Sequence, residues 1–295
     1  MGVAGQQLRD FVPTKEFFIG IDSDGCVFDT MGIKHRRCFG PMFIEVFGLE
    51  AVAGPACEVW EFVNLRSRTR GANRFQALLR AFQLLREHPA VRALGATVPE
   101  ATALAGWVAR ESRLGNATLK MEIDRGNEAL APVLAWSEAV NRAVECTVAR
   151  VPPFPGVREA LKAMSARADV VVVAQAPVAT LVREWEEHDL RRYVRLLAGQ
   201  ELGSKADHLR LATGGKYLPE HVLMIGDALG DLQAARAGHA LFYPIMPGRE
   251  PAAWADWRDN MLDRFLAGTY AGPEQGRLIA EFEASLPEYP SWQNR

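Results

Sequence analysis

The stretch FFIGIDSDGCVFDT occupies residues 17–30 and decides how the rest of the chain is interpreted. It opens with an apolar run that is typical of a buried strand, and Asp22 and Asp24 follow that run directly. Two carboxylates this close in the chain repel each other unless a positive charge lies between them. A metal ion or a basic side chain is therefore expected beside the pair.

Further apolar runs along the chain resemble residues 17–21. They are VVVVA at 170–174, VLMIG at 222–226, ALFYPI at 240–245 and, more weakly, YVRLLAG at 193–199. Short runs that are rich in β-branched residues and do not alternate are typical of strands buried on both faces of a parallel sheet. Because the segments between them have helical periodicity, the pattern predicts βαβ units and a doubly wound, Rossmann-like α/β core.

Residues 32–151 have a different character, with long stretches of helical periodicity and no comparable strand pattern. They predict a large all-α cap domain, inserted after the first strand and closed by the stiff, proline-rich VPPFPGV at 151–157. Residues 1–31 and 152–295 are assigned to the α/β core, which from about residue 246 continues as a C-terminal helical extension. Two domains are thus expected.

The composition narrows the classes of partner. A formal net charge of -2 over 295 residues provides no basic field for a nucleic acid, so no nucleic-acid partner is expected. Residues 1–15 lack the apolar centre of a secretory signal, and no apolar run approaches the roughly 20 residues of a membrane helix. The four cysteines are scattered without a metal-binding pattern, which favours a reducing compartment. A cytoplasmic protein with no membrane partner is expected.

Acidic residues follow two of the expected strands. Asp22 and Asp24 follow the first strand, and Asp227 and Asp231 follow the strand expected at 222–226. Ligands of an open parallel sheet bind outside the carboxyl ends of its strands, where the strand order reverses. If the two strands are neighbours, these carboxylates converge, and Mg²⁺ prefers such oxygen ligands together with phosphate oxygens of a substrate. We therefore expect Mg²⁺ as the cofactor.

Lys205 is the second positive group expected at this place. It stands at the predicted start of a helix that follows the expected strand at 193–199. A compact ammonium fits between a carboxylate and a phosphoryl group more easily than a guanidinium fork does. An exposed lysine in a first helical turn would show the same pattern.

Taken together, these segments resemble the haloacid dehalogenase superfamily, and more narrowly its phosphatase and phosphomutase branch. The resemblance is carried by DSDGCVFDT, the helical insertion, VPPFPGVREALKAM, VVVVAQAP, Lys205 and GDALGD, in that order along the chain. It covers the core from residue 17 to residue 245, whereas the cap matches only by its position and helicity.

The resemblance implies a mechanism and a set of site residues. Asp22 would be the nucleophile that forms an aspartyl phosphate, and Asp24 would act as general acid and then as general base. The metal would be held by the Asp22 carboxylate, the Asp24 backbone carbonyl and Asp227, with Asp231 in support. With Lys205 as a further catalytic residue, the expected function is that of a Mg²⁺-dependent phosphohydrolase acting on a small phosphorylated metabolite.

Other candidates are expected to bind the substrate. Lys34 lies near the start of the cap, and Arg66 and Arg70 lie in its arginine-rich stretch EFVNLRSRTRGANRF at 61–75. Arginine forks bind carboxylates and phosphates at two points, so part of this stretch is expected to contact the substrate's leaving group. A solvated loop or salt bridges to neighbouring helices would explain the same arginines.

One position departs from the family pattern. The second motif of the superfamily places Ser or Thr at the end of the second strand, and this chain has Ala174 there. Loss of one such hydrogen-bond donor costs about 100-fold to 1000-fold in rate. Gln175 or Ser23 could substitute for it. A weakened or inactive phospholigand-binding protein on the same scaffold, or a phosphomutase, therefore stays open, and the substrate and the oligomeric state are not determined.

Overall fold

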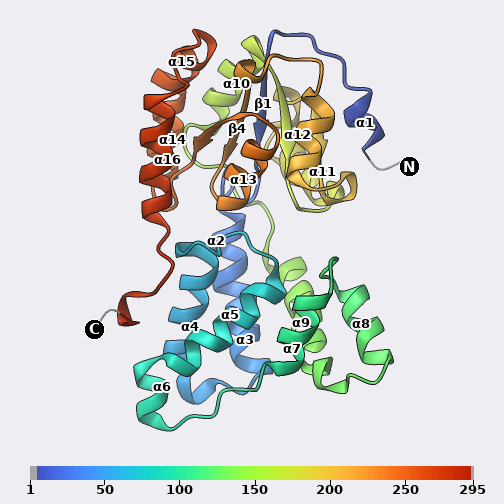
Figure 1. Cartoon of the computed structure of the whole chain (residues 1–295), viewed down its shortest axis with the longest axis vertical. Helices are drawn as coiled ribbons and strands as arrows, with labels where there is room; N and C mark the ends of the chain where they lie inside the picture. The colour runs from blue at the N-terminus through green and yellow to red at the C-terminus, as the bar shows by residue number, and fades with distance from the viewer. Residues whose placement is uncertain (1–4, 294–295) are drawn as a thin grey trace. The chain divides into compact units, whose positions relative to one another are not determined.

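The computed structural model describes residues 5–293, which belong to two compact units (Figure 1). Met1–Thr30 and Arg150–Ser285 make up the first, which we call the α/β unit. Met31–Ala149 and Leu286–Arg295 make up the second, which we call the helical unit. Among the helices of residues 5–293, none combines the length and the apolar composition that crossing a bilayer requires.

The α/β unit contains a five-stranded, all-parallel sheet with the strand order β3-β2-β1-β4-β5. The strands are β1 (Phe17–Ile21), β2 (Ala168–Val173), β3 (Leu196–Ala198), β4 (Val222–Gly226) and β5 (Leu241–Pro244). Every residue of β2 and β4 is buried, as expected for continuous apolar runs covered on both faces. From β1 the chain fills one side of the sheet and then crosses to the other, so the predicted doubly wound α/β core is confirmed.

The described part of the α/β unit also contains helices. They are α1 (Gln6–Arg9), α10 (Val157–Arg167), α11 (Val178–Glu187), α12 (Lys205–Thr213), α13 (Leu229–Ala237), α14 (Glu250–Asp256), α15 (Leu262–Leu266) and α16 (Pro273–Ser285). Single 3₁₀ or π turns lie between them at Arg191–Tyr193, Gln200–Leu202, Pro219–His221 and Trp257–Met261. In α10 the buried side chains are Val157, Ala160, Leu161 and Met164, a spacing that forms one apolar stripe.

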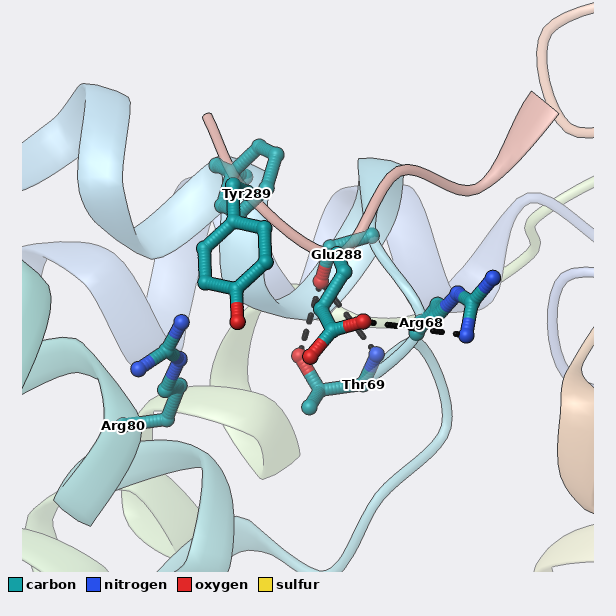
Figure 2. A pocket seen from close by; sticks show the side chains of 7 residues that line it. Arg68, Thr69, Arg80, Glu288 and Tyr289 are labelled. Atoms are coloured by element: carbon teal, nitrogen blue, oxygen red, sulfur yellow. Dashed lines mark hydrogen bonds and ion pairs between the residues drawn. The ribbon is translucent and has the colours of Figure 1, made fainter. Parts of the chain in front are cut away.

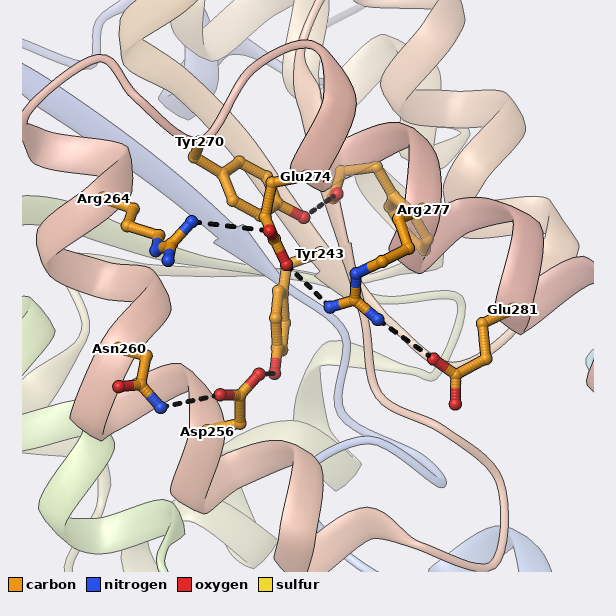
Figure 3. Close-up of polar contacts among 9 residues, drawn as sticks. Tyr243, Asp256, Asn260, Arg264, Tyr270, Glu274, Arg277 and Glu281 are labelled. Atoms are coloured by element: carbon orange, nitrogen blue, oxygen red, sulfur yellow. Dashed lines mark hydrogen bonds and ion pairs between the residues drawn. The ribbon is translucent and has the colours of Figure 1, made fainter.

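The C-terminal helices contact the open edge of β5, and Figure 3 shows Tyr243 and Tyr270 among the polar side chains of this region. The Phe242 N–H donates to Oε1 of Gln275 at 2.9 Å, and the Phe242 carbonyl accepts from the hydroxyl of Tyr270 at 2.6 Å. The hydroxyl of Tyr243 donates to the Ala253 carbonyl of α14 at 2.7 Å. Unpaired strand edges invite pairing with other chains, and here side chains of the extension satisfy the exposed backbone groups.

Asp169 anchors the chain segment that precedes β1. Its buried carboxylate accepts hydrogen bonds from the backbone of Thr14 and Lys15, at 2.7 and 3.0 Å, and from the hydroxyl of Tyr217 at 2.8 Å. Arg195 forms an ion pair with the same carboxylate. Burial raises the pKa of Asp169, but these hydrogen bonds outweigh it and hold that pKa below its usual range. The carboxylate is therefore charged at neutral pH.

In the described residues of the helical unit, 31–149 and 286–293, the regular elements are all helices. They are α2 (Thr30–Lys34), α3 (Gly40–Val46), α4 (Ala53–Glu61), α5 (Arg74–Glu87), α6 (Pro89–Leu94), α7 (Thr102–Arg110), α8 (Asn116–Asp124) and α9 (Ala131–Thr147), with short turns at His35–Phe39, Glu50–Val52, Phe62–Arg66, Glu128–Leu130 and Ser291–Gln293. Their core is aromatic, since the Trp60 ring lies 5.0 Å from that of Phe43 and 5.7 Å from that of Trp136.

The last described residues, 286–293, belong to the helical unit, whereas all of 152–295 was expected in the α/β core. Leu286 and Pro290 are buried, and the Trp292 ring lies 5.7 Å from that of Phe62 and 5.1 Å from that of His88. The assignment of this C-terminal segment is thus corrected, because its aromatic side chain finds its contacts on the helical unit.

Candidate active site

The strands that carry the acidic residues are neighbours. Ile21 of β1 pairs with Ile225 of β4, and the N–H of Asp22 donates to the Ile225 carbonyl at 3.0 Å. Asp227 follows β4 directly. The carboxyl ends of β1 and β4 therefore meet at the point where the strand order reverses, which is where open α/β sheets bind their ligands.

Three carboxylates converge at this point. Asp22, Asp227 and Asp231 each place an oxygen within 4.8 Å of the others, and their side chains are buried. Lys205 at the start of α12 inserts its ammonium among them, with Nζ 2.9 Å from Oδ2 of Asp22 and 2.6 Å from Oδ1 of Asp231. One ammonium does not balance three buried carboxylates, so the cluster favours a further cation.

The electrostatics of the cluster follow from this imbalance. Burial and the carboxylates of Asp231 and Asp227 hold the pKa of Asp22 well above its usual range, against the opposing effect of the neighbouring ammonium. Burial by itself would lower the pKa of Lys205, but the two carboxylates that it contacts raise that pKa. The lysine is therefore charged at neutral pH, and a cation placed among the carboxylates would favour their ionised forms.

Asp231 is positioned by backbone groups and by a glycine. Its Oδ2 accepts from the N–H groups of Asp227 at 3.2 Å and Ala228 at 3.0 Å, at the start of α13. A Cβ added to Gly226 would lie 2.4 Å from Cβ and Cγ of Asp231. The glycine therefore provides the space in which Asp231 reaches Lys205, while Asp231 also satisfies the first turn of its own helix.

Gly226→Ala is expected to lower the free energy of unfolding by about 1–3 kcal/mol, because the added methyl group overlaps the Asp231 side chain. Urea unfolding measures this change. Gly230→Ala is the matched control, since a Cβ at Gly230 on α13 meets nothing within 4 Å and alanine favours a helix. Equal unfolding midpoints for the two variants would contradict the steric role of Gly226.

Asp24 is not one of the three carboxylates that lie within 4.8 Å of one another. Its half-buried side chain accepts a hydrogen bond from the hydroxyl of Thr30. Gly25 follows in the left-handed region with φ of 82°, which a residue with a side chain rarely adopts and which turns the chain away from the strand. Because only the backbone carbonyl of Asp24 was expected to bind the metal, the absence of its carboxylate from this group is compatible with a role as acid and base.

Among the described residues, both side chains that were expected to substitute for a hydroxyl at the end of β2, Ser23 and Gln175, have hydrogen-bond partners of their own. Ala174 is buried, and the Ser23 hydroxyl accepts a hydrogen bond from the indole of Trp185 at 3.1 Å. Gln175 is exposed, and its amide donates to the Gly203 carbonyl at 3.0 Å. To reach a phosphoryl group Gln175 would have to leave that bond, at a cost of about 0.5–1.5 kcal/mol.

The predicted substrate-binding residues Lys34, Arg66 and Arg70 belong to the helical unit. Arg70 is buried and donates to the Leu65 carbonyl at 3.0 Å, so it stabilises its own loop. Arg66 is exposed and lies 3.4 Å from Glu61, and Lys34 ends α2 in a half-buried position. A contact of these residues with the substrate stays a prediction.

Arg74 is a further candidate for anion binding in the helical unit, and it is not among the substrate-binding residues expected from the sequence. Its Nη1 donates to Oγ of Ser137 at 3.0 Å and to Oδ1 of Asn141 at 2.7 Å, and its guanidinium lies 5.0 Å from the ring centre of Phe39. These partners are neutral, and within residues 5–293 no ion pair of Arg74 is found. Burial lowers its pKa. A half-buried cation without a counter-ion is suited to an anionic ligand.

Several solved structures are similar to this chain. A predicted phosphoglycolate phosphatase from Haemophilus somnus 129PT aligns with a TM-score of 0.49 and 14% identity over 78% of this chain and 86% of its own. A haloacid dehalogenase-like hydrolase from Streptococcus pneumoniae aligns with a TM-score of 0.43 and 14% identity over 83% and 91%. CbbY from Rhodobacter sphaeroides, in complex with phosphate, aligns with a TM-score of 0.43 and 16% identity over 78% and 87%. No protein-family model and no curated protein matches the sequence. At these identities the similarities concern the fold alone.

Proposed function

We propose that this chain is a metal-dependent phosphohydrolase of the haloacid dehalogenase superfamily, acting on a small phosphorylated metabolite. The observation that carries the proposal is the convergence of Asp22, Asp227 and Asp231 within 4.8 Å, with the ammonium of Lys205 in contact with two of them. Buried acidic groups with perturbed pKa values at a topological switch point are typical of active sites.

The donor set suits Mg²⁺. Its ligand atoms are carboxylate oxygens, which hard divalent cations prefer, and the excess of negative charge favours a cation. Asp22, Asp227, Asp231 and the backbone carbonyl of Asp24 would hold the ion. When bound, it would supply positive charge that offsets the repulsion between the carboxylates and the phosphate oxygens of a substrate.

Asp22, Asp24 and Lys205 have different roles in the proposed reaction. A carboxylate oxygen of Asp22 attacks phosphorus while the bond to the leaving oxygen breaks, which gives an aspartyl phosphate. Asp24 donates a proton to the leaving oxygen and then accepts a proton from the water that hydrolyses the intermediate. The ammonium of Lys205, 2.9 Å from Asp22, holds the nucleophile in place and offsets negative charge that develops on the phosphoryl oxygens.

Phosphate release from a panel of phosphorylated metabolites tests this proposal. The panel includes esters with and without a second anionic group. Release is expected from some members when Mg²⁺ is present, and EDTA should abolish it until excess Mg²⁺ is added. Release that continues unchanged in EDTA would contradict the metal-dependent mechanism, and the ranking of the substrates would identify their class.

A second candidate function rests on Ala174. The end of β2 lacks the hydroxyl expected there, and Gln175 is engaged with the Gly203 carbonyl. A protein that binds a phosphorylated ligand without hydrolysing it would tolerate this loss. Such a protein would bind a phosphate mimic and Mg²⁺ and would show no turnover that depends on Asp22.

A further inference from the structure

A pocket of about 380 Å³ lies within the helical unit (Figure 2). The C-terminal segment contributes Glu288 and Tyr289 to its lining, and the rest of the helical unit contributes Phe62, Arg68 and Arg80 among others. This volume falls within the range of about 300–1,000 Å³ found for small-molecule sites. All the lining residues belong to the helical unit, and none was assigned to the cluster around Asp22.

Arg80 provides a positive charge that the protein leaves uncompensated. Its side chain is half-buried on α5, and within residues 5–293 it has neither an ion pair nor a hydrogen bond. Figure 2 shows its guanidinium and the hydroxyl of Tyr289 at the pocket. A guanidinium and a phenol are both hydrogen-bond donors, so together they suit an anionic acceptor.

A second guanidinium is held only loosely. Arg68 lies 3.8 Å from Glu288, and both side chains are 56% exposed. An exposed ion pair of this kind contributes at most about 1 kcal/mol to stability, so an anionic ligand can take the place of Glu288 beside Arg68 at little cost in free energy. Two arginines against one glutamate leave the lining with a net positive charge, which favours an anion over a cation.

Aromatic rings form the apolar part of the pocket. The Phe62 side chain is buried, and Tyr289 is 54% exposed, which is unusual for so large a side chain and makes its ring accessible to a ligand. Ser67 and Thr69 complete the lining, and their hydroxyls are hydrogen-bonded to each other at 2.8 Å. The ligand that fits these groups has an anionic head and a small apolar body.

We propose that this pocket binds a small organic anion, with its carboxylate or phosphate group on Arg80 and Arg68 and its apolar body between Phe62 and Tyr289. A bound ligand would contact both the C-terminal segment and the rest of the helical unit, so it would stabilise the packing of that segment against the unit. The proposal does not depend on the proposed hydrolase activity.

The indole resonance of Trp292 reports on binding, because its ring lies 5.7 Å from that of Phe62. The probes are benzoate and phenylphosphonate, which represent the two head groups and contain no phosphate ester to hydrolyse, and neutral benzamide is the control. A saturable shift of the resonance is expected with at least one of the two anions at constant ionic strength, and not with benzamide. The anion that shifts it at lower concentration identifies the head group.

Arg80→Gln is expected to weaken binding of that anion at least about tenfold, the effect of losing one charged hydrogen bond. Arg142→Gln makes the same charge change at an exposed position of α9 and should leave the affinity unchanged. If the unliganded Arg80→Gln protein shows altered indole resonances, Arg80→Lys takes its place, and weaker binding is again expected. The absence of a saturable shift, or equal affinities for the Arg80 and Arg142 variants, would overturn the proposal.

Discussion

Asp22→Asn is expected to lower the rate of phosphate release at least about 1000-fold while the protein stays folded, because an amide lacks the charged oxygen that attacks phosphorus. The substitution also removes one of three carboxylates that share a single ammonium. We therefore expect the free energy of unfolding to be unchanged or higher. Phosphate release at saturating substrate and Mg²⁺, together with thermal unfolding, measures both effects.

Asp263→Asn is the matched control for this experiment. Asp263 lies on α15 of the α/β unit, its side chain is 72% exposed, and it pairs with Arg167 at the surface. Its loss should change neither the rate nor the stability by a large amount. If Asp22→Asn kept a tenth or more of the rate, Asp22 would not be the nucleophile. If the unaltered protein released no phosphate yet bound a phosphate mimic, the binding function suggested by Ala174 would replace hydrolysis.

Lys205→Ala is expected to lower the free energy of unfolding by about 3–5 kcal/mol, because it leaves the buried carboxylates of Asp22 and Asp231 without their ammonium. Phosphate release should fall as well, since the same ammonium holds the nucleophile. Mg²⁺ is expected to restore part of the lost stability, because it binds the folded protein at the uncompensated carboxylates. Urea unfolding with and without Mg²⁺ measures these changes.

Lys162→Ala controls for the loss of a lysine as such. Lys162 is exposed on α10, so its removal is expected to change the free energy of unfolding by less than about 0.5 kcal/mol. Similar midpoints for the two lysine variants would show that the ion pairs of Lys205 contribute nothing to stability. If Mg²⁺ stabilised the Lys205→Ala protein no more than it stabilises the unaltered protein, the result would count against a metal site in this cluster.

Local sequence patterns were sufficient to predict the strands of the sheet and the position of the acidic residues at the carboxyl ends of those strands. Short apolar runs identify strands that are buried on both faces, and a motif that follows a strand directly must lie at its carboxyl end. Boundaries were less exact, since the second strand was expected at 170–174 and runs over Ala168–Val173, and the weak run at 193–199 contains only Leu196–Ala198. Strand ends depend on pairing with neighbours, which a single run does not contain.

By itself, the sequence determined the doubly wound core, the helical insertion and the candidate cluster, because these depend on periodicity and on residues adjacent to strands. Only the tertiary structure decided which arginine of the stretch 61–75 has no ion pair within the described residues: Arg70 is used by its own loop, whereas Arg74 at the start of α5 has neutral partners. It also decided that the C-terminal segment belongs to the helical unit, where Trp292 packs against Phe62. Such contacts join residues far apart in the chain, and their pairing is selected by the packing of the whole unit and not by any local pattern.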